Sequence, residues 1–247
     1  LPALPGSAGS SLSIDRIIRR AVDESNRLAG AGFDAVIVEN FGDAPFHADR
    51  VPAETVAAMS VVVDHVVRAV KVPVGVNVLR NDGLSGLAVA AATGAAFIRV
   101  NVLSGVYATD QGFITGRPAE LLPRRAAVAP GVCIAADVHV KHAQPISQPD
   151  ISLAAEETAY RGGADALIVS GVSTGTPADM NKVRRVAEAV PDRPLWIGSG
   201  VTAESVRDYL ALADGVIVGT ALKKGGNTTA ELDDKRVKQF IAAARRK

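Results

Sequence analysis

The sequence predicts an α/β fold of the (β/α)8 TIM-barrel class, and three observations lead to that prediction. Short, nearly continuous apolar runs alternate with helical patterns along the whole chain, as expected for parallel strands that are buried on both faces. The length of 247 residues is close to that of one α/β barrel. No linker or shift in composition divides the chain, so residues 1–247 are expected to form a single domain.

Seven strands are expected. In chain order they are Ala35–Glu39, Val72–Val78, Phe97–Val102, Val132–Val138, Ala166–Ser170, Pro194–Gly198 and Gly215–Gly219. A TIM barrel has eight parallel strands. The opening Leu1–Gly6 resembles a loop that follows a strand, so the first strand is expected upstream of Leu1 and is missing from this numbering. A seven-stranded or open doubly wound sheet is the alternative.

The composition argues against several classes of function. The 27 Lys and Arg residues nearly balance the 26 Asp and Glu residues, and only Arg245–Lys247 form a basic cluster, so no nucleic-acid partner is expected. No apolar run is long enough for a transmembrane segment and no signal peptide is visible, which favours a cytoplasmic protein and leaves peripheral membrane association open. The one cysteine, Cys133, cannot form an intrachain disulfide and is expected to be a packed core thiol.

The loops after the last two expected strands suit a phosphate group. The first loop holds Ser199 and Gly200, whose backbone can approach an anion closely, and Thr202, which is expected to cap the next helix. The second begins with Gly219 and Thr220. In TIM barrels these two loops commonly hold a substrate phosphate at the C-terminal face. Ordinary tight turns are the alternative, because glycine marks turns in any case.

Three other connections are candidates for shaping a site. Ser170 ends a strand and is expected to contact the substrate or its phosphate; the following Gly171–Gly175 is either another wall of the site or a plain connection. The loop Asp43–Asp49 and the long connection Ser104–Pro118 are candidate lids, since long loops in compact domains are often functional.

Polar residues also crowd the ends of the other strands. Glu39 directly follows an apolar run and is a candidate general acid or base, or else an ion-pair partner of Arg99 or Arg80. Asn77, Arg99 and Asn101 are expected to orient a substrate.

Asp137, His139 and Lys141 alternate along the end of one expected strand, so their side chains are expected to point the same way. Asp137 can set the tautomer of His139 for proton transfer, and Lys141 can bind an anion or, when desolvated, attack a carbonyl. The alternative is a structural network in which Asp137 pairs with Arg99 and Lys141 is solvated. These groups also permit a divalent metal, but no spacing identifies a cofactor.

Six ordered motifs give the chain a family resemblance along nearly its whole length. They are Leu1–Gly6, Val38–Phe46, Gly75–Asp82, Phe97–Asn101, Asp137–His142 and Gly198–Thr202. Through them the sequence resembles the BtpA family, which includes the SgcQ-like proteins. The resemblance implies a phosphate-binding TIM barrel whose members begin with a strand just before the first motif, a strand that this chain lacks.

The resemblance implies a biological role without a reaction. The family takes its name from photosystem I biogenesis or stability in cyanobacteria, where the protein is associated with the thylakoid surface. SgcQ-like members sit among sugar-metabolism genes. No catalytic residue is carried over from the family to this chain.

Two functions therefore remain open. The first is a lyase or isomerase that acts on a phosphosugar or a nucleotide-like metabolite, with Asp137, His139 and Glu39 as catalytic residues. The second is a non-catalytic assembly or stability factor, as in photosystem I biogenesis. The density of ionisable groups at the strand ends favours the enzyme. Homo-oligomers are common among soluble chains of this kind, so one is also considered.

Overall fold

The computed structural model describes residues 1–245, which form two compact units. Unit 1 comprises Leu1–Val100 and Ala119–Ile134, and unit 2 comprises Asn101–Pro118 and the chain from Ala135 onward. The two units are interleaved in the sequence, and the single domain expected from composition stays a prediction.

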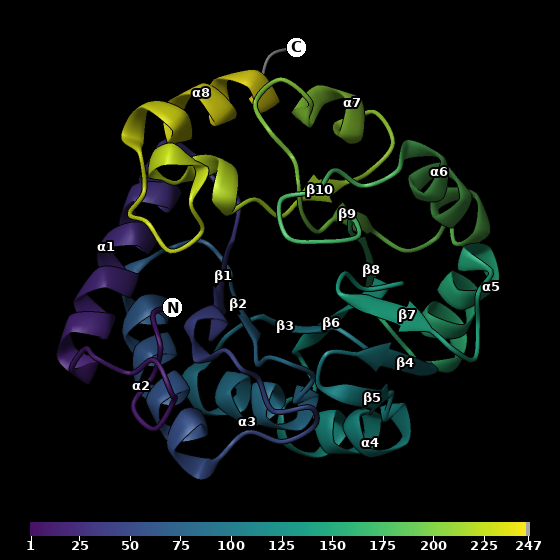
Figure 1. Cartoon of the computed structure of the whole chain (residues 1–247), viewed down its shortest axis with the longest axis horizontal. Coiled ribbons are helices and arrows are strands. Elements are labelled where there is room, and N and C mark those ends of the chain that lie inside the picture. The colour runs from purple at the N-terminus through teal and green to yellow at the C-terminus, as the bar shows by residue number, and fades with distance from the viewer. Residues whose placement is uncertain (246–247) are drawn as a thin grey trace. The chain divides into compact units, whose positions relative to one another are not determined.

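Unit 1 contains three parallel strands that alternate with helices (Figure 1). The strands are β1 (Val36–Glu39), β2 (Val74–Asn77) and β3 (Phe97–Val100), in the order β1-β2-β3. The helices are α1 (Ile14–Ala31), α2 (Ala53–Ala69), α3 (Gly83–Thr93) and α4 (Pro118–Val128), with a short 3-10 helix η1 (Phe41–Asp43). Every residue of β2 and β3 is buried, as the continuous apolar runs predict.

Unit 2 continues the same alternation. Its parallel strands are β6 (Cys133–Val138, which enters this unit at Ala135), β8 (Ala166–Val169), β9 (Leu195–Ile197) and β10 (Gly215–Val216), each paired with the next. Its helices are α5 (Ile151–Glu156), the π-helix η2 (Glu157–Arg161), α6 (Met180–Ala189), α7 (Val206–Leu210), the 3-10 helices η3 (Thr220–Leu222) and η4 (Lys224–Gly226), and α8 (Asp234–Arg245). All seven expected strands are thus confirmed, each somewhat shorter than predicted.

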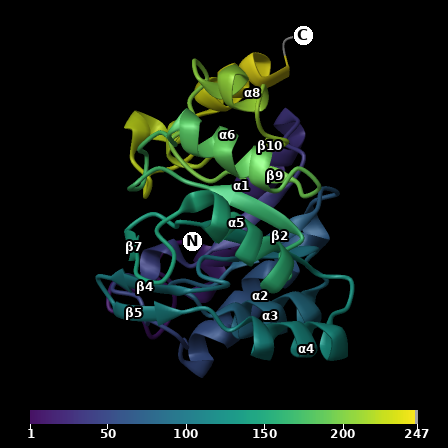
Figure 2. The same cartoon turned by 90° about the vertical axis from the view of Figure 1, so that its right-hand side faces the viewer.

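Unit 2 also holds a small antiparallel sheet that the sequence analysis did not anticipate (Figure 2). It consists of β4 (Val106–Thr109), β5 (Gly112–Thr115) and β7 (Ala143–Pro145), in the order β5-β4-β7. The connection Ser104–Pro118 therefore contains a β-hairpin, and its role as a lid stays a prediction. Its two arms are rich in β-branched and aromatic residues, and Gly112, with φ +97°, supplies the left-handed conformation that the tight turn needs.

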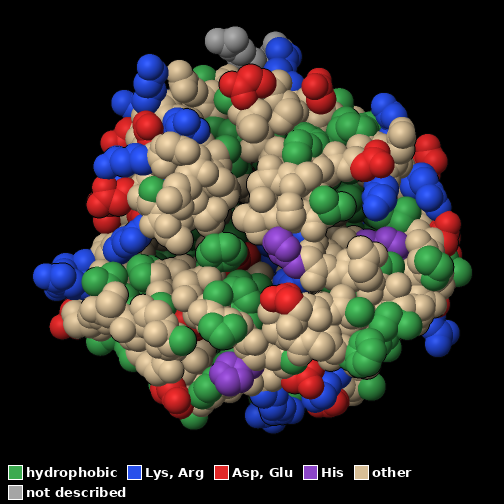
Figure 3. All heavy atoms as spheres, viewed as in Figure 1, with side chains coloured by type: hydrophobic (Ala, Val, Ile, Leu, Met, Phe, Trp, Pro, Cys, Tyr) green, Lys and Arg blue, Asp and Glu red, His purple; other side chains and the backbone are tan. Residues whose placement is uncertain are grey.

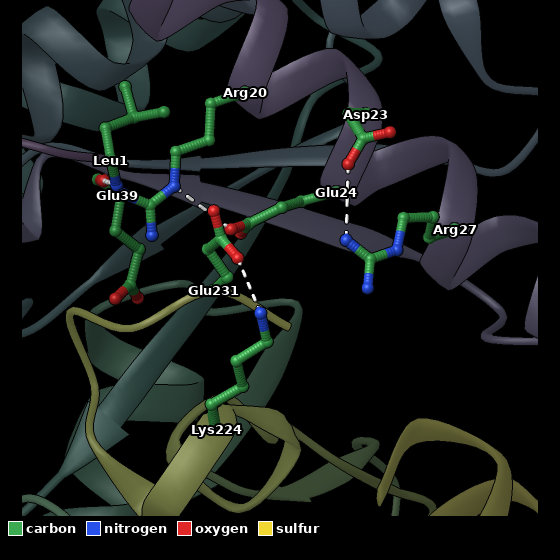
Figure 4. Close-up of polar contacts among 8 residues, drawn as sticks. All are labelled: Leu1, Arg20, Asp23, Glu24, Arg27, Glu39, Lys224 and Glu231. Carbon is green, nitrogen blue, oxygen red and sulfur yellow. Dashed lines mark hydrogen bonds and ion pairs between the residues drawn. The ribbon is translucent and has the colours of Figure 1, made fainter. Parts of the chain in front are cut away.

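The first residues of the chain pack on the loop after β1. The nitrogen of Leu1 donates to the carbonyl of Glu39 (Figure 4), and the backbone N–H of Leu4, a fully buried residue, donates to Asp43 Oδ1 at 2.7 Å. A Cβ on Gly42 would lie 2.3 Å from the backbone nitrogen of Ala3, so only glycine permits this close approach. The two motifs at residues 1–6 and 38–46 therefore belong to one packed substructure.

The prediction for Cys133 is wrong. Cys133 is exposed, because it is the first residue of β6 and the buried part of that strand begins at Ile134. Among the described residues, no helix is both long and apolar enough to cross a membrane.

Candidate functional site

At the strand ends of unit 1, Glu39 accepts two hydrogen bonds on the same carboxylate oxygen. Asn77 Nδ2 donates to Glu39 Oε1 at 2.9 Å, and Arg99 Nη1 lies 3.2 Å from the same atom. Glu39 and Asn77 are the last residues of β1 and β2 and face each other in register. The Arg99 side chain is only 3% exposed, so its charge requires a nearby anion. The ion pair between Glu39 and Arg99, one of the expected alternatives, is therefore present, and the role of Glu39 as a general acid or base stays a prediction.

Other polar residues at this end of unit 1 hold the backbone together. Asn40 clamps Leu79: its Oδ1 accepts the Leu79 N–H at 2.7 Å, and its Nδ2 donates to Asp43 Oδ2 at 3.0 Å. The Arg80 N–H donates to the carbonyl of His47 at 3.1 Å, which attaches the candidate lid Asp43–Asp49 to the loop after β2. These contacts complete the hydrogen bonding of loops and do not point to a ligand.

In unit 2, a buried carboxylate links two strand ends. Asp137 Oδ2 accepts from Asn101 Nδ2 at 3.0 Å, and Asp137 Oδ1 accepts from Ser170 Oγ at 3.0 Å. All three side chains are buried. Because Nδ2 must face the carboxylate, the orientation of the Asn101 amide is fixed. Within the described residues, Asn101 Oδ1 has no hydrogen-bond partner.

The predicted alternation of Asp137, His139 and Lys141 on one strand face is wrong. Strand β6 ends at Val138, and His139 takes a left-handed conformation with φ +52°. Side chains alternate only while the backbone stays extended, so His139 and Lys141 leave the face that Asp137 occupies. Lys141 lies past the strand end and is partly exposed.

His139 is held by a backbone carbonyl. Its Nε2 lies 2.8 Å from the carbonyl oxygen of Gln148. A carbonyl can only accept, so Nε2 carries the proton and Nδ1 keeps its lone pair in the neutral ring. Burial lowers the pKa of His139 from its ordinary value, which favours this neutral form near pH 7. Gln148 therefore sets the tautomer, a role that the sequence analysis gave to Asp137.

Tyr107 of β4 is a member of this group that sequence reasoning did not place there. Its ring meets the His139 ring edge-on, with centroids 6.3 Å apart and an interplanar angle of 71°. Burial raises the pKa of Tyr107 to about 12, with a backbone hydrogen bond from His139 opposing the rise. No sequence signal pairs these residues, because the contact depends on the hairpin.

The loops after β8 and β9 pack closely on each other. A Cβ added to Gly200, in the loop after β9, would lie 2.2 Å from the carbonyl oxygen of Thr176 in the loop after β8. Within the loop after β8, a Cβ added to Gly171 would lie 2.1 Å from the same oxygen. The Gly175 N–H donates to Ser199 Oγ at 3.1 Å. The loop Gly171–Gly175 thus packs against the loop that holds Ser199 and Gly200, and its role as a wall of a ligand site stays a prediction. Since Ser170 directly precedes Gly171, this loop adjoins the Asp137 group.

The helix-terminus part of the phosphate prediction is wrong. Thr202 does not cap a helix: its N–H donates to Ser205 Oγ at 3.1 Å, and α7 begins only at Val206 and has five residues. Gly219 and Thr220 lead into the short 3-10 helix η3, where Thr220 Oγ1 lies 2.9 Å from Thr228 Oγ1. The glycines still allow the backbone of these loops to approach an anion closely, but no long helix directs its dipole at the loops.

Charges on the surface are mixed in sign. Figure 3 shows basic and acidic side chains interspersed around the edge of the viewed face, with no extended basic patch. Individual pairs such as Arg20–Glu24 at 3.1 Å and Lys224–Glu231 at 2.7 Å join opposite charges locally (Figure 4). Among the residues that the structure describes, no three or more His, Cys, Asp and Glu side chains form a group that could hold a metal ion.

Solved structures place this architecture among the α/β proteins of the TIM-barrel type. Thiamine phosphate pyrophosphorylase from Pyrococcus furiosus is similar with a TM-score of 0.61 and 18% identity, covering 93% of this chain and 92% of that one. Orotidine 5′-phosphate decarboxylase from Pyrococcus horikoshii OT3 is similar with a TM-score of 0.58 and 14% identity, covering 92% and 94%. At such identities the similarity shows the fold alone.

The family is shown directly by the sequence. The model of the BtpA family matches residues 1–246, and the chain belongs to that family. The photosystem I biogenesis protein BtpA of Synechocystis sp. is 45% identical over 240 residues, which cover 97% of this chain and 84% of the relative. The putative sgc region protein SgcQ of Escherichia coli K12 is 34% identical over 244 residues, covering 98% and 90%.

Proposed function

We propose that this chain is an enzyme that binds a phosphorylated small molecule at the strand ends of unit 2. The observation that carries the proposal is the continuity of the buried Asn101–Asp137–Ser170 group with the packed glycine loops that begin at Gly171. The buried polar group would then form the reactive end of a site, and the glycine loops beside it would form the end that binds an anion.

The phosphate would meet the backbone and hydroxyl groups of the glycine loops. The candidate contacts are Ser170, Ser199, Gly200, Thr202, Gly219 and Thr220, with Lys141 as a nearby cation. The names of similar solved proteins support this, because each contains a phosphorylated compound: thiamine phosphate pyrophosphorylase, N-(5′-phosphoribosyl)anthranilate isomerase and orotidine 5′-phosphate decarboxylase.

The chemistry would be a proton transfer of the lyase or isomerase type. His139 is suited to act as a general base through Nδ1, because its Nε2 proton is held by Gln148 and its pKa is lowered by burial. Asp137 would act on protons beside it, and Asn101 would orient the substrate. The catalytic role expected for Glu39, and the substrate-orienting roles expected for Asn77 and Arg99, stay predictions for unit 1.

An assembly or stability factor is the second candidate. The name of the Synechocystis relative favours it, and so do the exposed side chains of Phe113, Ile146 and Val172 in unit 2, which are 71%, 54% and 73% exposed. A protein partner or a peripheral membrane contact would use such a surface. A cytoplasmic location and a homo-oligomer also remain proposals.

Thermal shift measurements test the two candidates. Inorganic phosphate, phosphosugars, nucleotides and divalent metals are added singly, because a ligand that binds the folded state raises the Tm by mass action. A phosphate-dependent shift that Gly200→Ala reduces supports the enzyme. Gly94→Ala is the matched control, since Gly94 also has a positive φ (+78°) but lies in unit 1 with open space around it.

The response to the compounds decides between the candidates. A compound that shifts the Tm is then assayed for turnover, where His139→Ala and Asp137→Asn should each lower kcat at least about 100-fold if these residues transfer protons. Full activity in both variants would refute the assigned roles. No shift with any compound would favour the assembly factor.

A further inference from the structure

The Asn101 amide is satisfied on one side only. Its side chain is 2% exposed, and its Nδ2 donates to Asp137 Oδ2 at 3.0 Å. Flipping the amide would place Oδ1 against the carboxylate, where two acceptors repel each other, so a flip does not give Oδ1 a hydrogen-bond donor. Oδ1 therefore remains a buried acceptor without a donor among the described residues. Buried carbonyl oxygens nearly always have a partner, so this one requires an explanation.

The other atoms of the group are also acceptors. The two oxygens of Asp137 receive the protons of Asn101 and Ser170, at 3.0 Å each. The Ser170 hydroxyl has its single proton committed to Asp137, which leaves its lone pairs outward. His139, held through Nε2 by Gln148, offers the lone pair of Nδ1. Apart from the second N–H of Asn101 Nδ2, the Asn101, Asp137 and Ser170 side chains thus present acceptors to a ligand.

We infer that the ligand of this site presents a hydrogen-bond donor to Asn101 Oδ1, and that the end of the ligand beyond its phosphate carries hydroxyl or N–H groups and no carboxylate. The inference rests on the proposed function, which supplies the phosphate end. It deepens that proposal by selecting polyhydroxylated phosphates over phosphorylated carboxylic acids.

The selection follows from charge as well as from hydrogen bonding. A second carboxylate brought beside Asp137 would face a like charge. A hydroxyl satisfies Oδ1 and remains neutral. Oδ1 is shielded from solvent in the structure, so a ligand reaches it only as neighbouring residues shift, and measured affinities include that cost.

Calorimetric titration with three probes tests the inference. Inorganic phosphate measures the anion site alone, ribose 5-phosphate adds hydroxyl donors, and 2-phosphoglycolate adds a carboxylate. The wild-type chain is expected to bind ribose 5-phosphate at least about tenfold more tightly than phosphate, the effect of one to two neutral hydrogen bonds. It is expected to gain nothing from the carboxylate of 2-phosphoglycolate.

Two alanine variants separate the acceptor from the network. Asn101→Ala and Ser170→Ala each remove one hydrogen bond to Asp137, but only the first removes Oδ1. The ratio of phosphate to ribose 5-phosphate dissociation constants should fall to near one in Asn101→Ala and persist in Ser170→Ala. Asn101→Ser, which removes Oδ1 but keeps a hydroxyl that can donate to Asp137, replaces the alanine variant if that one does not fold.

The outcomes distinguish this inference from the proposal it rests on. If no probe binds the wild-type chain, both fail. If phosphate binds but the ratio is the same in Asn101→Ala as in wild type, or 2-phosphoglycolate binds as tightly as ribose 5-phosphate, the phosphate site stands and the donor inference is overturned.

Discussion

Alanine placed in turn at Gly175, Gly171 and Gly200 separates backbone strain from close packing in the loops after β8 and β9. Gly175 has φ +81° and no atom within 4 Å of an added Cβ, so only the left-handed conformation is costly there. Gly171 has an ordinary φ, but its Cβ would lie 2.1 Å from the Thr176 carbonyl oxygen. Gly200 combines both features, with φ +74° and an approach of 2.2 Å to the same oxygen.

The costs can be worked from these contacts. A left-handed alanine costs about 1–2 kcal/mol, partly offset by about 0.4–1 kcal/mol because alanine restricts the unfolded chain, so Gly175→Ala should cost about 1 kcal/mol. A clash with backbone cannot be relieved by a rotamer change, and overpacking of this kind costs about 1–3 kcal/mol, which applies to Gly171→Ala. Gly200→Ala should cost about 2–4 kcal/mol.

Urea denaturation of the three variants and the wild-type chain at pH 7 and 25 °C measures these differences, with a common m-value checked for each. The expected order of destabilisation is Gly175→Ala, then Gly171→Ala, then Gly200→Ala. If Gly200→Ala costs no more than Gly175→Ala, the two loops are not in contact, and the packing beside the proposed phosphate site is refuted; Gly171→Ala tests the packing within the loop after β8.

Three further predictions concern single side chains. Glu39→Gln should lower the free energy of unfolding by about 1–3 kcal/mol, because it removes the carboxylate 3.2 Å from buried Arg99, whereas Asp64→Asn at an exposed ion pair should change it little; urea denaturation compares them. Burial lowers the pKa of His139 in the folded chain, so the unfolded chain takes up the proton at higher pH than the folded chain does. The contribution of His139 to the free energy of unfolding should therefore be full above about pH 6.5 and decline below it. Denaturation curves measured from pH 8 to 5 should show a flatter decline for His139→Gln than for the wild-type chain. Exposed Cys133 should react with Ellman's reagent in the native protein as one thiol per chain, while reaction only after unfolding would contradict its placement.

The parallel strands were predictable because their signal is local. A strand buried on both faces is a short apolar run, and β8, with all four residues buried, has that pattern in the sequence. The hairpin was not recognised, although the arms of β4 and β5 are β-branched and aromatic. The turn of the hairpin contains Asp110 and Gln111, which is not one of the strong two-residue hairpin signals. The third strand of the small sheet, β7, comes from a segment about 30 residues further on.

The site was only partly predictable, because strand-end position does not determine side-chain direction. Asp137 lies where the pattern places it, on an extended strand. His139, two residues on, adopts a φ of +52°, and its ring turns to the Gln148 carbonyl. That conformation is uncommon for a residue with a Cβ, and no local sequence pattern predicts it here. The contact with Tyr107 depends in turn on the hairpin.

Two asparagines show what the structure adds to a list of polar strand ends. Asn40 directly follows β1, and Asn101 directly follows β3. The amide of Asn40 is satisfied through both of its polar atoms, by Leu79 and Asp43, so its role is complete without a ligand. The amide of Asn101 is satisfied through Nδ2 alone. The free-energy cost of a buried acceptor without a partner is removed only by a donor. Asn40 therefore has a structural role in its loop, whereas Asn101 is a candidate contact for a substrate.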